Sequence, residues 1–264
     1  MRYGLKGREE KTGTVRIAIA GGGTGGHLFP GLALAAKLGE LEPGCRLLFI
    51  GTRRGIEAER VPRAGYTLET VDAVGMKGRG LRGLLQALWR LPRAVWHCTR
   101  ILRRFRPSVV VGLGGYASAP AVMAAWLCCV PVVLMEQNAL PGVTNRWLGR
   151  FARVVVVAFE EAKSYFGRKK VRLLGNPVRA EIAGVRNRPH ETREKRLLVF
   201  GGSQGARALN ETVPPAVALA AKKLPQLKVR HQTGRNDFES VRRAYERAGL
   251  DARVEPFIED MAEA

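Results

Sequence analysis

The sequence predicts an α/β fold with two Rossmann-like, doubly wound parallel sheets, the second of them incomplete. Three observations predict this fold class. Short runs rich in Val, Ile and Leu alternate with longer segments of helical pattern. Three glycine-rich turns each follow such a run and precede a helical segment. A polar, charged stretch separates two cycles of the pattern. Together these features indicate two α/β domains joined by a linker.

The first cycle contains six predicted strands, each short and bounded by Gly, Pro or polar residues. They lie at residues 15–20, 45–51, 66–73, 109–113, 132–135 and 154–157. Apolar helices are expected at 28–41 and 119–129. The stretch from Pro107 to Met135 has no charged residue and is long enough for a membrane span. Because Gly114, Pro120 and Pro131 interrupt it, we predict a buried strand, a helix and a second buried strand instead.

The second cycle begins after the linker, with strands expected at 197–200, 227–232 and 253–257. We therefore divide the chain into a polar leader at 1–13, an N-terminal domain at 14–176, a linker at 177–196 and the first half of a C-terminal domain at 197–264. About 70 residues after the linker are fewer than a doubly wound domain usually needs. We expect a C-terminally truncated chain that is weakly active or inactive by itself.

The charge balance is the outlying property of the composition. The 264 residues include 44 Lys and Arg against 23 Asp and Glu, a formal net charge of +21. The hydrophobic content of 46% excludes a disordered chain. The excess of positive charge indicates an anionic partner: nucleic acid, a membrane surface or a phosphorylated substrate. The four cysteines have no C-x-x-C or zinc-type spacing, so we expect no metal site and a reducing cytosol.

The glycine-rich turns indicate a bound diphosphate. Gly21, Gly23 and Gly26 match G-x-G-x-x-G between a strand and a helix, where backbone N–H groups can approach a phosphate. The second predicted strand ends without the acidic residue that binds a dinucleotide's ribose, which disfavours NAD. Further turns of this kind lie at 112–120 and 201–206.

Two side chains near these turns are candidates for chemistry. His27 begins the first helix, where it either packs as a structural residue or acts as a general base or phosphate contact. Glu136 follows a buried strand, where it either meets a ligand or accepts hydrogen bonds from its own loop. The sequence alone leaves both alternatives open.

A basic, apolar segment occupies residues 76–106, with nine basic residues and no acid. Its apolar residues recur at helical spacing and comprise Leu81, Leu84, Leu85, Leu88 and Trp89. This pattern fits either a helix whose apolar stripe packs in the core or one that lies on an anionic membrane. We expect Pro92 to kink or divide the segment. No nucleic-acid-binding motif is recognisable, so we expect no nucleic-acid partner.

Five motifs in order resemble the MurG family, the peptidoglycan N-acetylglucosaminyltransferases that act on a lipid-linked muramyl-pentapeptide. They are GGGTGGHLFPGLALA, GLGGYASAPAVMAA, EQNALPGVTNRWL, GNPVR and FGGSQGARALN. The resemblance runs from about residue 15 to 261. It implies a GT-B architecture, with the lipid acceptor on the N-terminal domain and UDP-N-acetylglucosamine mainly on the C-terminal one. The family's G-A-x-T-x-x-E-type segment has no counterpart before residue 264.

The resemblance also implies roles for individual residues. His27 is the candidate catalytic base. The residues expected to bind the donor substrate are Thr24, Gly25, Gly26, Asn138, Arg179, Ser203 and Ile258. Asn138 would face the sugar, Arg179 and Ser203 the phosphates, and the Ile258 backbone the uracil. Gly114, Gly115 and Tyr116 would form the loop for the acceptor diphosphate, and the residues from Leu81 to Trp89 would meet the membrane.

The implied reaction is an inverting transfer of N-acetylglucosamine to the acceptor's 4-hydroxyl, from lipid I to lipid II, without cofactor or metal. The implied partners are UDP-N-acetylglucosamine, undecaprenyl-pyrophosphoryl-muramyl-pentapeptide and the anionic cytoplasmic face of the bacterial inner membrane, where the protein would be peripheral. Peptidoglycan synthesis, cell shape and cell division are the implied processes. The alternatives are a UDP-sugar epimerase of GT-B architecture and a non-catalytic basic membrane-binding protein.

Overall fold

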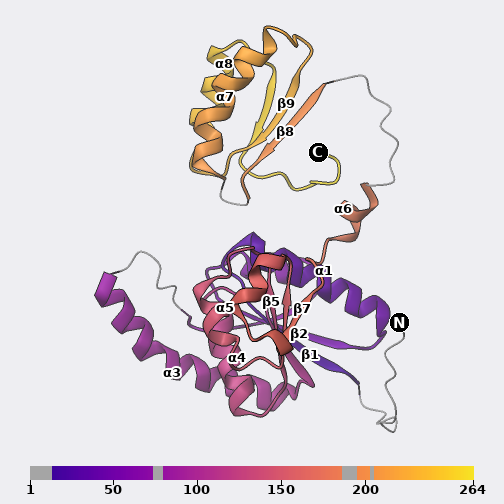
Figure 1. Ribbon diagram of the computed structural model, residues 1–264, viewed down its shortest axis with the longest axis vertical. Helices are drawn as coiled ribbons and strands as arrows, with labels where there is room; N and C mark the ends of the chain where they lie inside the picture. The colour runs from indigo at the N-terminus through magenta and orange to yellow at the C-terminus, as the bar shows by residue number, and fades with distance from the viewer. Residues whose placement is uncertain (1–13, 74–79, 186–194, 203–204) are drawn as a thin grey trace. The chain divides into compact units, whose positions relative to one another are not determined.

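The computed structural model describes residues 14–73, 80–185, 195–202 and 205–264, apart from the side chains of 80–89. The chain divides into two compact units, the first ending at Pro177 and the second beginning at Val178. Each unit is an α/β structure with a parallel sheet (Figure 1). The predicted α/β class with parallel sheets is therefore confirmed.

The first unit contains a seven-stranded parallel sheet in the order β3-β2-β1-β4-β5-β6-β7. Its strands are β1 (Arg16–Ala20), β2 (Arg46–Gly51), β3 (Thr67–Thr70), β4 (Val109–Gly112), β5 (Val132–Glu136), β6 (Val154–Val157) and β7 (Val171–Leu173). Chain order reverses beside β1, which is the topological switch point of a doubly wound sheet. The loops after β1 and β4 come together at this switch point, because the two strands are parallel neighbours and end side by side.

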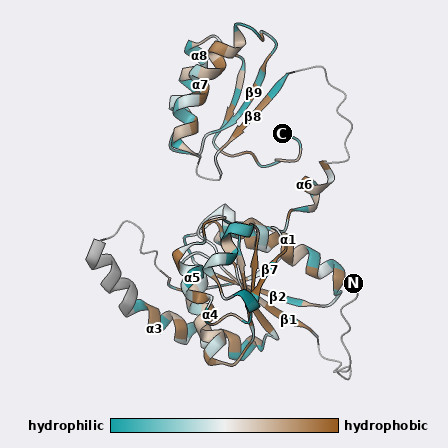
Figure 2. Cartoon of the chain, viewed as in Figure 1, coloured by the Kyte–Doolittle hydropathy of each residue, from teal (hydrophilic) through white to brown (hydrophobic). Residues whose placement is uncertain are grey.

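Helices cover both faces of this sheet (Figure 1). They are α1 (Gly25–Leu41), α2 (Glu57–Arg63), α3 (Gly80–Phe105), α4 (Ser118–Leu127) and α5 (Val143–Leu148), with 3₁₀ turns η1 (Glu160–Tyr165) and η2 (Arg168–Lys170). The alternation of side chains along β1 explains the two layers: Ile17 and Ile19 pack with α1, whereas Ala18 and Ala20 pack with α3 and α4. Hydrophobic colour fills the central strands (Figure 2), as expected for strands covered on both faces.

Of the two outcomes expected at Pro92, a kink or a division, the division is wrong: the segment is one helix, α3, and Pro92 does not divide it. The Pro92 side chain is exposed, and the following turns are held by buried contacts of Val95 and Cys98, so one missing backbone hydrogen bond is tolerated. The strand β7 was not predicted, because its three residues begin directly after the basic turn η2 and give almost no periodic signal.

The strand–helix–strand prediction for the uncharged stretch is confirmed by β4, α4 and β5. Among the described helices, none combines the length and apolar character that crossing a bilayer requires.

The second unit begins with α6 (Ala180–Gly184) and contains a three-stranded parallel sheet in the order β10-β9-β8. The strands are β8 (Arg196–Phe200), β9 (Lys228–Gln232) and β10 (Ala252–Glu255), and the longer helices are α7 (Arg207–Ala221) and α8 (Phe238–Arg247). Val199 and Val229 of the sheet pack against Val217 of α7 and Val241 and Tyr245 of α8. The core of this unit therefore lies between the sheet and two helices, on one face of the sheet.

Candidate functional site

The first glycine loop, Gly21–Gly23, follows the carboxyl end of β1 and leads into α1. A Cβ on Gly22 would lie 2.2 Å from Cδ of Glu57, and Gly22 has a φ of +150°, so no larger residue fits. Thr24 then caps α1 through its backbone: the N–H groups of His27 and Leu28 donate to its carbonyl, and its side chain makes no cap. The loop thus delivers Thr24, Gly25 and Gly26 to the N-terminus of a 17-residue helix, where backbone N–H groups favour an anion.

Glu57 holds this loop from beneath. Its side chain is fully buried; Oε2 accepts the Gly23 N–H at 2.7 Å, while Oε1 accepts the backbone N–H and the hydroxyl of Thr52, each at 2.8 Å. A Cβ on Gly51 or Gly55 would also collide with this side chain. Charge-assisted bonds to backbone N–H groups are among the stronger hydrogen bonds in proteins. Glu57 is therefore a structural anchor of the loop, and both of its oxygens are already engaged.

The second loop, 113–117 between β4 and α4, lies against the first. Gly114 has a φ of +93°, and a Cβ there would lie 2.9 Å from Nδ2 of Asn145 and 3.1 Å from Cε1 of His27. A Cβ on Gly115 would lie 3.0 Å from the carbonyl oxygen of Gly22. The ring of Tyr116 approaches the Cβ position of Gly23 to 3.2 Å. Glycines in the second loop therefore leave the space that the His27 imidazole occupies.

His27 lies where three loops meet and is half-buried. Its Nδ1 is 3.1 Å from Oε1 of Gln137, which follows β5, and its ring lies 3.1–3.3 Å from the Cβ positions of Gly114 and Gly115. The backbone carbonyl of Gln137 also accepts a hydrogen bond from Nδ2 of Asn176 at 3.4 Å. The side chain that the sequence marked as the base thus lies at the sheet's switch point, beside the loop expected to hold the acceptor diphosphate.

Glu136 accepts hydrogen bonds within its own loop. Oε1 accepts the backbone N–H and the Nδ2 of Asn138, both at 3.0 Å, and Oε2 accepts the Gly142 N–H at 3.2 Å and the Nδ2 of Asn145 at 3.0 Å. The carboxylate is buried. With four donors on two oxygens, its lone pairs are occupied. Of the two alternatives, the structure supports the loop acid, and Glu136 orients the exposed Asn138 by its amide.

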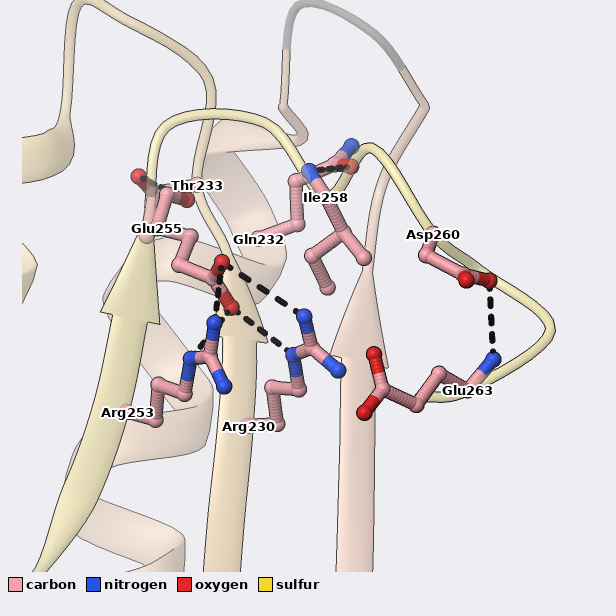
Figure 3. Close-up of polar contacts among 8 residues, drawn as sticks. All are labelled: Arg230, Gln232, Thr233, Arg253, Glu255, Ile258, Asp260 and Glu263. Atoms are coloured by element: carbon pink, nitrogen blue, oxygen red, sulfur yellow. Dashed lines mark hydrogen bonds and ion pairs between the residues drawn. The ribbon is translucent and has the colours of Figure 1, made fainter.

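The third glycine loop follows β8 in the second unit and is held by Gln232 at the end of β9. Gln232 Nε2 donates to the Gly202 carbonyl at 2.6 Å, and its Oε1 accepts the Ile258 N–H at 2.9 Å (Figure 3). Ile258 is fully buried. The resemblance assigns the Ile258 backbone to uracil, and the N–H group of that backbone is bound by Gln232. Ser203 lies outside the described residues.

The far end of this loop packs on Thr233. A Cβ on Gly205, which has a φ of +76°, would lie 1.8 Å from the Thr233 carbonyl oxygen. The same oxygen accepts a hydrogen bond from Nδ2 of the buried Asn210 on α7 at 2.9 Å. The N-cap of α7, Ala206, provides no side-chain cap. The third loop therefore connects a strand to a helix whose N-cap residue makes no side-chain hydrogen bond, as the first loop does.

A charge cluster lies next to it on the sheet (Figure 3). The Glu255 carboxylate accepts hydrogen bonds from Arg230 at 2.7 Å and from Arg253 at 3.2 Å. Burial by itself raises the pKa of Glu255, but the hydrogen bonds and charges of Arg230 and Arg253 outweigh it and lower the pKa. Beyond β10, Asp260 Oδ1 accepts the backbone N–H groups of Ala262 and Glu263.

The remaining predicted residues lie elsewhere. Arg179 is the half-buried N-cap of α6. The side chains of Leu81, Leu84, Leu85, Leu88 and Trp89 lie outside the described residues, although their backbone belongs to α3. In the described part of α3, one stripe is buried in the core, whereas Trp96 is 62% exposed with the Arg100 guanidinium 4.9 Å from its ring centroid. Among the described residues, no group of three or more His, Cys, Asp and Glu could hold a metal ion.

Three important side chains were missed from the sequence: Glu57, Gln137 and Gln232. Each forms a hydrogen bond to a residue that is distant in sequence. The separation is 34 residues for Glu57, 30 for Gln232 and 110 for Gln137. Glu57 had a weak signal, an acid six residues after the glycine that ends β2. Gln137 stands inside the EQN motif, whose pattern indicated roles for Glu136 and Asn138 and none for the residue between them. Gln232 had no local signal.

Comparison with known proteins identifies both units. Residues 17–157 match the glycosyltransferase family 28 N-terminal domain, and residues 196–264 match the glycosyltransferase family 28 C-terminal domain. A curated protein from Myxococcus xanthus is 50% identical over 251 residues, which is 95% of this chain and 66% of that protein. One from Syntrophus aciditrophicus is 46% identical over 95% of this chain and 70% of its own length. Both are named UDP-N-acetylglucosamine--N-acetylmuramyl-(pentapeptide) pyrophosphoryl-undecaprenol N-acetylglucosamine transferase.

Solved structures agree. The crystal structure of Acinetobacter baumannii MurG matches with a TM-score of 0.66 and 31% identity, over 94% of this chain and 68% of that one. A UDP-GlcNAc 2-epimerase from Neisseria meningitidis matches with a TM-score of 0.65 but only 14% identity, over 95% of this chain and 74% of that one, which shows a shared fold alone. The chain spans 66% of the length of the M. xanthus relative. The family resemblance is thus confirmed: the chain belongs to the MurG family within glycosyltransferase family 28.

Proposed function

We propose that the protein transfers N-acetylglucosamine from UDP-N-acetylglucosamine to a lipid-linked N-acetylmuramyl-pentapeptide, which converts lipid I to lipid II in peptidoglycan synthesis. The observation that carries the proposal is 50% identity over 95% of the chain to a protein named for this reaction. The geometry supports it, because His27 lies between two glycine loops at the switch point of the first sheet.

His27 is the proposed general base. Its Nδ1 is engaged by Gln137, and its ring lies against Gly114 and Gly115, which we assign with Tyr116 to the acceptor diphosphate. The acceptor's 4-hydroxyl gives its proton to His27 Nε2 while its oxygen attacks the anomeric carbon of the donor sugar. The bond from that carbon to the UDP oxygen breaks, UDP leaves with the electron pair, and the configuration inverts.

We assign seven residues to the donor, as the family resemblance implies: Thr24, Gly25, Gly26, Asn138, Arg179, Ser203 and Ile258. The leaving diphosphate gains negative charge during the reaction. Arg179, the third glycine loop and the uncapped N-terminus of α7 supply positive charge and N–H donors, which is electrostatic stabilisation without a metal. Gln232 binds the Ile258 N–H, so a uracil that meets this backbone either uses its carbonyl group or requires the Gln232 side chain to turn away.

A peripheral site on the cytoplasmic face of the bacterial inner membrane accompanies this function, since the acceptor is a lipid. The proposed contact is the first half of α3, Leu81 to Trp89, continued by the exposed Trp96 and the basic Arg100. Tryptophans and basic side chains on one helix suit an anionic bilayer surface. Through lipid II the protein would contribute to cell-wall growth, cell shape and cell division.

The test is transfer of labelled N-acetylglucosamine from its UDP derivative to a lipid-linked muramyl-peptide. It compares the chain of 264 residues with the same chain joined to the C-terminal third of the M. xanthus relative. Transfer by either form, abolished by His27→Gln, supports the proposal; we expect much the stronger signal from the extended form. Absence of transfer from both forms, with both folded, would refute it.

The same samples separate the other functions. Conversion of UDP-N-acetylglucosamine to its 2-epimer without acceptor would indicate the epimerase instead. Co-sedimentation with anionic vesicles but not with oligonucleotides at matched salt would support the membrane contact. Substituting Trp96→Ala removes the exposed aromatic of that surface and is expected to weaken vesicle binding severalfold without changing the thermal unfolding midpoint.

A further inference from the structure

The Gln137 side chain is buried, yet only one of its two polar atoms has a partner among the described residues. It is 8% exposed. Its Oε1 lies 3.1 Å from Nδ1 of His27, whereas Nε2 is buried with no hydrogen-bond partner among the described residues. A buried amide N–H group without an acceptor lowers stability. An apolar side chain of similar length would avoid this penalty, so packing alone does not account for an amide at this position.

The Oε1 atom of Gln137 determines which ring nitrogen of His27 carries the proton. In a neutral imidazole one ring nitrogen carries the proton and the other carries a lone pair. The carbonyl oxygen of Gln137 only accepts, so the contact requires the proton on Nδ1 of His27. The lone pair is then on Nε2, which lies 3.7 Å from the position that a Cβ on Gly115 would take. The neutral amide sets this tautomer without adding a charge beside the ring.

We propose that Gln137 is a positioning residue that fixes the Nδ1-protonated tautomer of His27 and so keeps Nε2 free to accept the proton of the attacking hydroxyl. This role rests on the proposed transferase function. It explains why the side chain is held with one polar atom engaged and the other unsatisfied: the carbonyl oxygen is the atom that matters.

Other titratable groups around His27 do not take this role. Glu57 lies beneath the first loop and is bonded to Gly23 and Thr52. Glu136 precedes Gln137 and is bonded within its own loop. Tyr116 contacts the first loop at Gly23. In the part of the chain that the structure describes, Gln137 provides the hydrogen bond to a ring nitrogen of His27.

The direct test is ¹⁵N NMR of the histidine-labelled chain, in which the two ring-nitrogen shifts identify the tautomer. The His27→Gln spectrum identifies which signals belong to His27 among the four histidines. We expect Nδ1–H in the native chain and a mixture of both tautomers in Gln137→Met, with an unfolding midpoint equal to or above native. The exposed Gln226→Met, the same change in the second unit, is the control and leaves His27 unchanged.

Kinetics then separate positioning from structure. In the form of the protein that transfers, Gln137→Met is expected to lower kcat about tenfold or more while KM stays near native. Gln137→Glu retains an acceptor oxygen at Nδ1, so it restores the tautomer. Its carboxylate also favours the imidazolium form, which moves the acidic limb of the pH–rate profile to higher pH by about one unit or more.

An Nε2-protonated His27 in the native chain, or an unchanged tautomer in Gln137→Met, would overturn the proposal. So would a changed tautomer with native kcat. If neither form of the chain transfers sugar, the proposed function fails on that assay, and the NMR result still decides whether Gln137 sets the tautomer.

Discussion

The first and third glycine loops are built alike but anchored by opposite chemistry. Each follows a strand, β1 or β8, and leads into a long helix whose N-cap offers no side-chain bond. Beneath the first loop a buried carboxylate, Glu57, accepts the Gly23 N–H. Beneath the third a buried neutral amide, Gln232, donates to the Gly202 carbonyl. One anchor therefore uses up a loop N–H group, and the other engages a loop carbonyl.

This difference between the anchors affects which ligands each loop can bind. A negative charge under the first loop opposes an anion at that site and leaves one fewer backbone donor. The neutral anchor of the third loop adds no such charge, and because it donates to a carbonyl it occupies no backbone N–H group of the loop. A diphosphate is therefore expected to prefer the third loop, while the first loop presents His27. The predictions below test this contrast in order of expected effect.

The largest effect is expected for Gly205→Ala in the third loop. The new Cβ would lie 1.8 Å from the Thr233 carbonyl oxygen, at a φ of +76° that L-residues disfavour. The overlap and the backbone strain together are expected to destabilise the second unit by about 3 kcal/mol or more. Hydrogen exchange of peptides from β8, β9 and α7 measures this loss. Native-like exchange would show that the loop moves aside easily.

Gly202→Ala is the matched control in the same loop. Gly202 also has a positive φ, +84°, but no atom lies within 4 Å of its Cβ position. Only backbone strain remains, so the expected loss is about 1 kcal/mol. All four tryptophans, Trp89, Trp96, Trp126 and Trp147, belong to the first unit. Their fluorescence should therefore follow the same urea curve in both variants as in the native chain.

Reciprocal substitution of the two anchors tests the comparison itself. Glu57→Gln keeps an acceptor for Thr52 but turns an amide NH₂ toward the Gly23 N–H, leaving that donor unsatisfied. The expected cost is about 1–3 kcal/mol in the first unit, read by tryptophan fluorescence in urea. Gln232→Glu turns a carboxylate toward the Gly202 carbonyl, and hydrogen exchange of the second unit should show a similar or larger loss.

The two substitutions should also differ in their dependence on pH. Once protonated, the carboxyl group that Gln232→Glu introduces can again donate to the Gly202 carbonyl, so the penalty of this substitution is expected to shrink as pH falls. Binding of UDP should weaken in this variant, because the new charge opposes the diphosphate. Glu57→Gln should leave UDP binding near native. Equal effects of both on UDP affinity would remove the distinction between the loops.

The sequence identified the loops and could not identify their anchors. A glycine run between a strand and a helix is a local pattern, so all three turns and the strands that precede them were predictable from residues close together in the chain. Gln232 reaches Gly202 across 30 positions, and Gln137 reaches His27 across 110. Such contacts depend on which strands become neighbours, and a single sequence carries no pattern for them. Glu136 was placed correctly at the edge of the sheet, but only its four donors decided its role.

The smallest expected effect concerns a buried pair of side chains in the second unit, His231 and Tyr245. His231 on β9 is fully buried, with Nδ1 3.0 Å from the Tyr245 hydroxyl and Nε2 without a partner among the described residues. Burial lowers the pKa of His231 from 6.5 and raises the pKa of Tyr245 to about 12. Both groups are therefore neutral in the folded second unit at neutral pH.

The sign of the pH dependence follows from these directions. Below pH 6.5 the unfolded chain binds a proton at His231 that the folded unit resists, so the second unit loses stability as pH falls. One proton contributes at most about 1.4 kcal/mol per pH unit. Hydrogen exchange of β9 and α8 between pH 7.5 and 5.5, corrected for the intrinsic rate, measures it. His231→Gln should flatten this part of the profile, whereas the exposed His97→Gln in the first unit should not. An unchanged profile in His231→Gln would mean that the carboxylates of the unit, and not this pair, govern its acid stability.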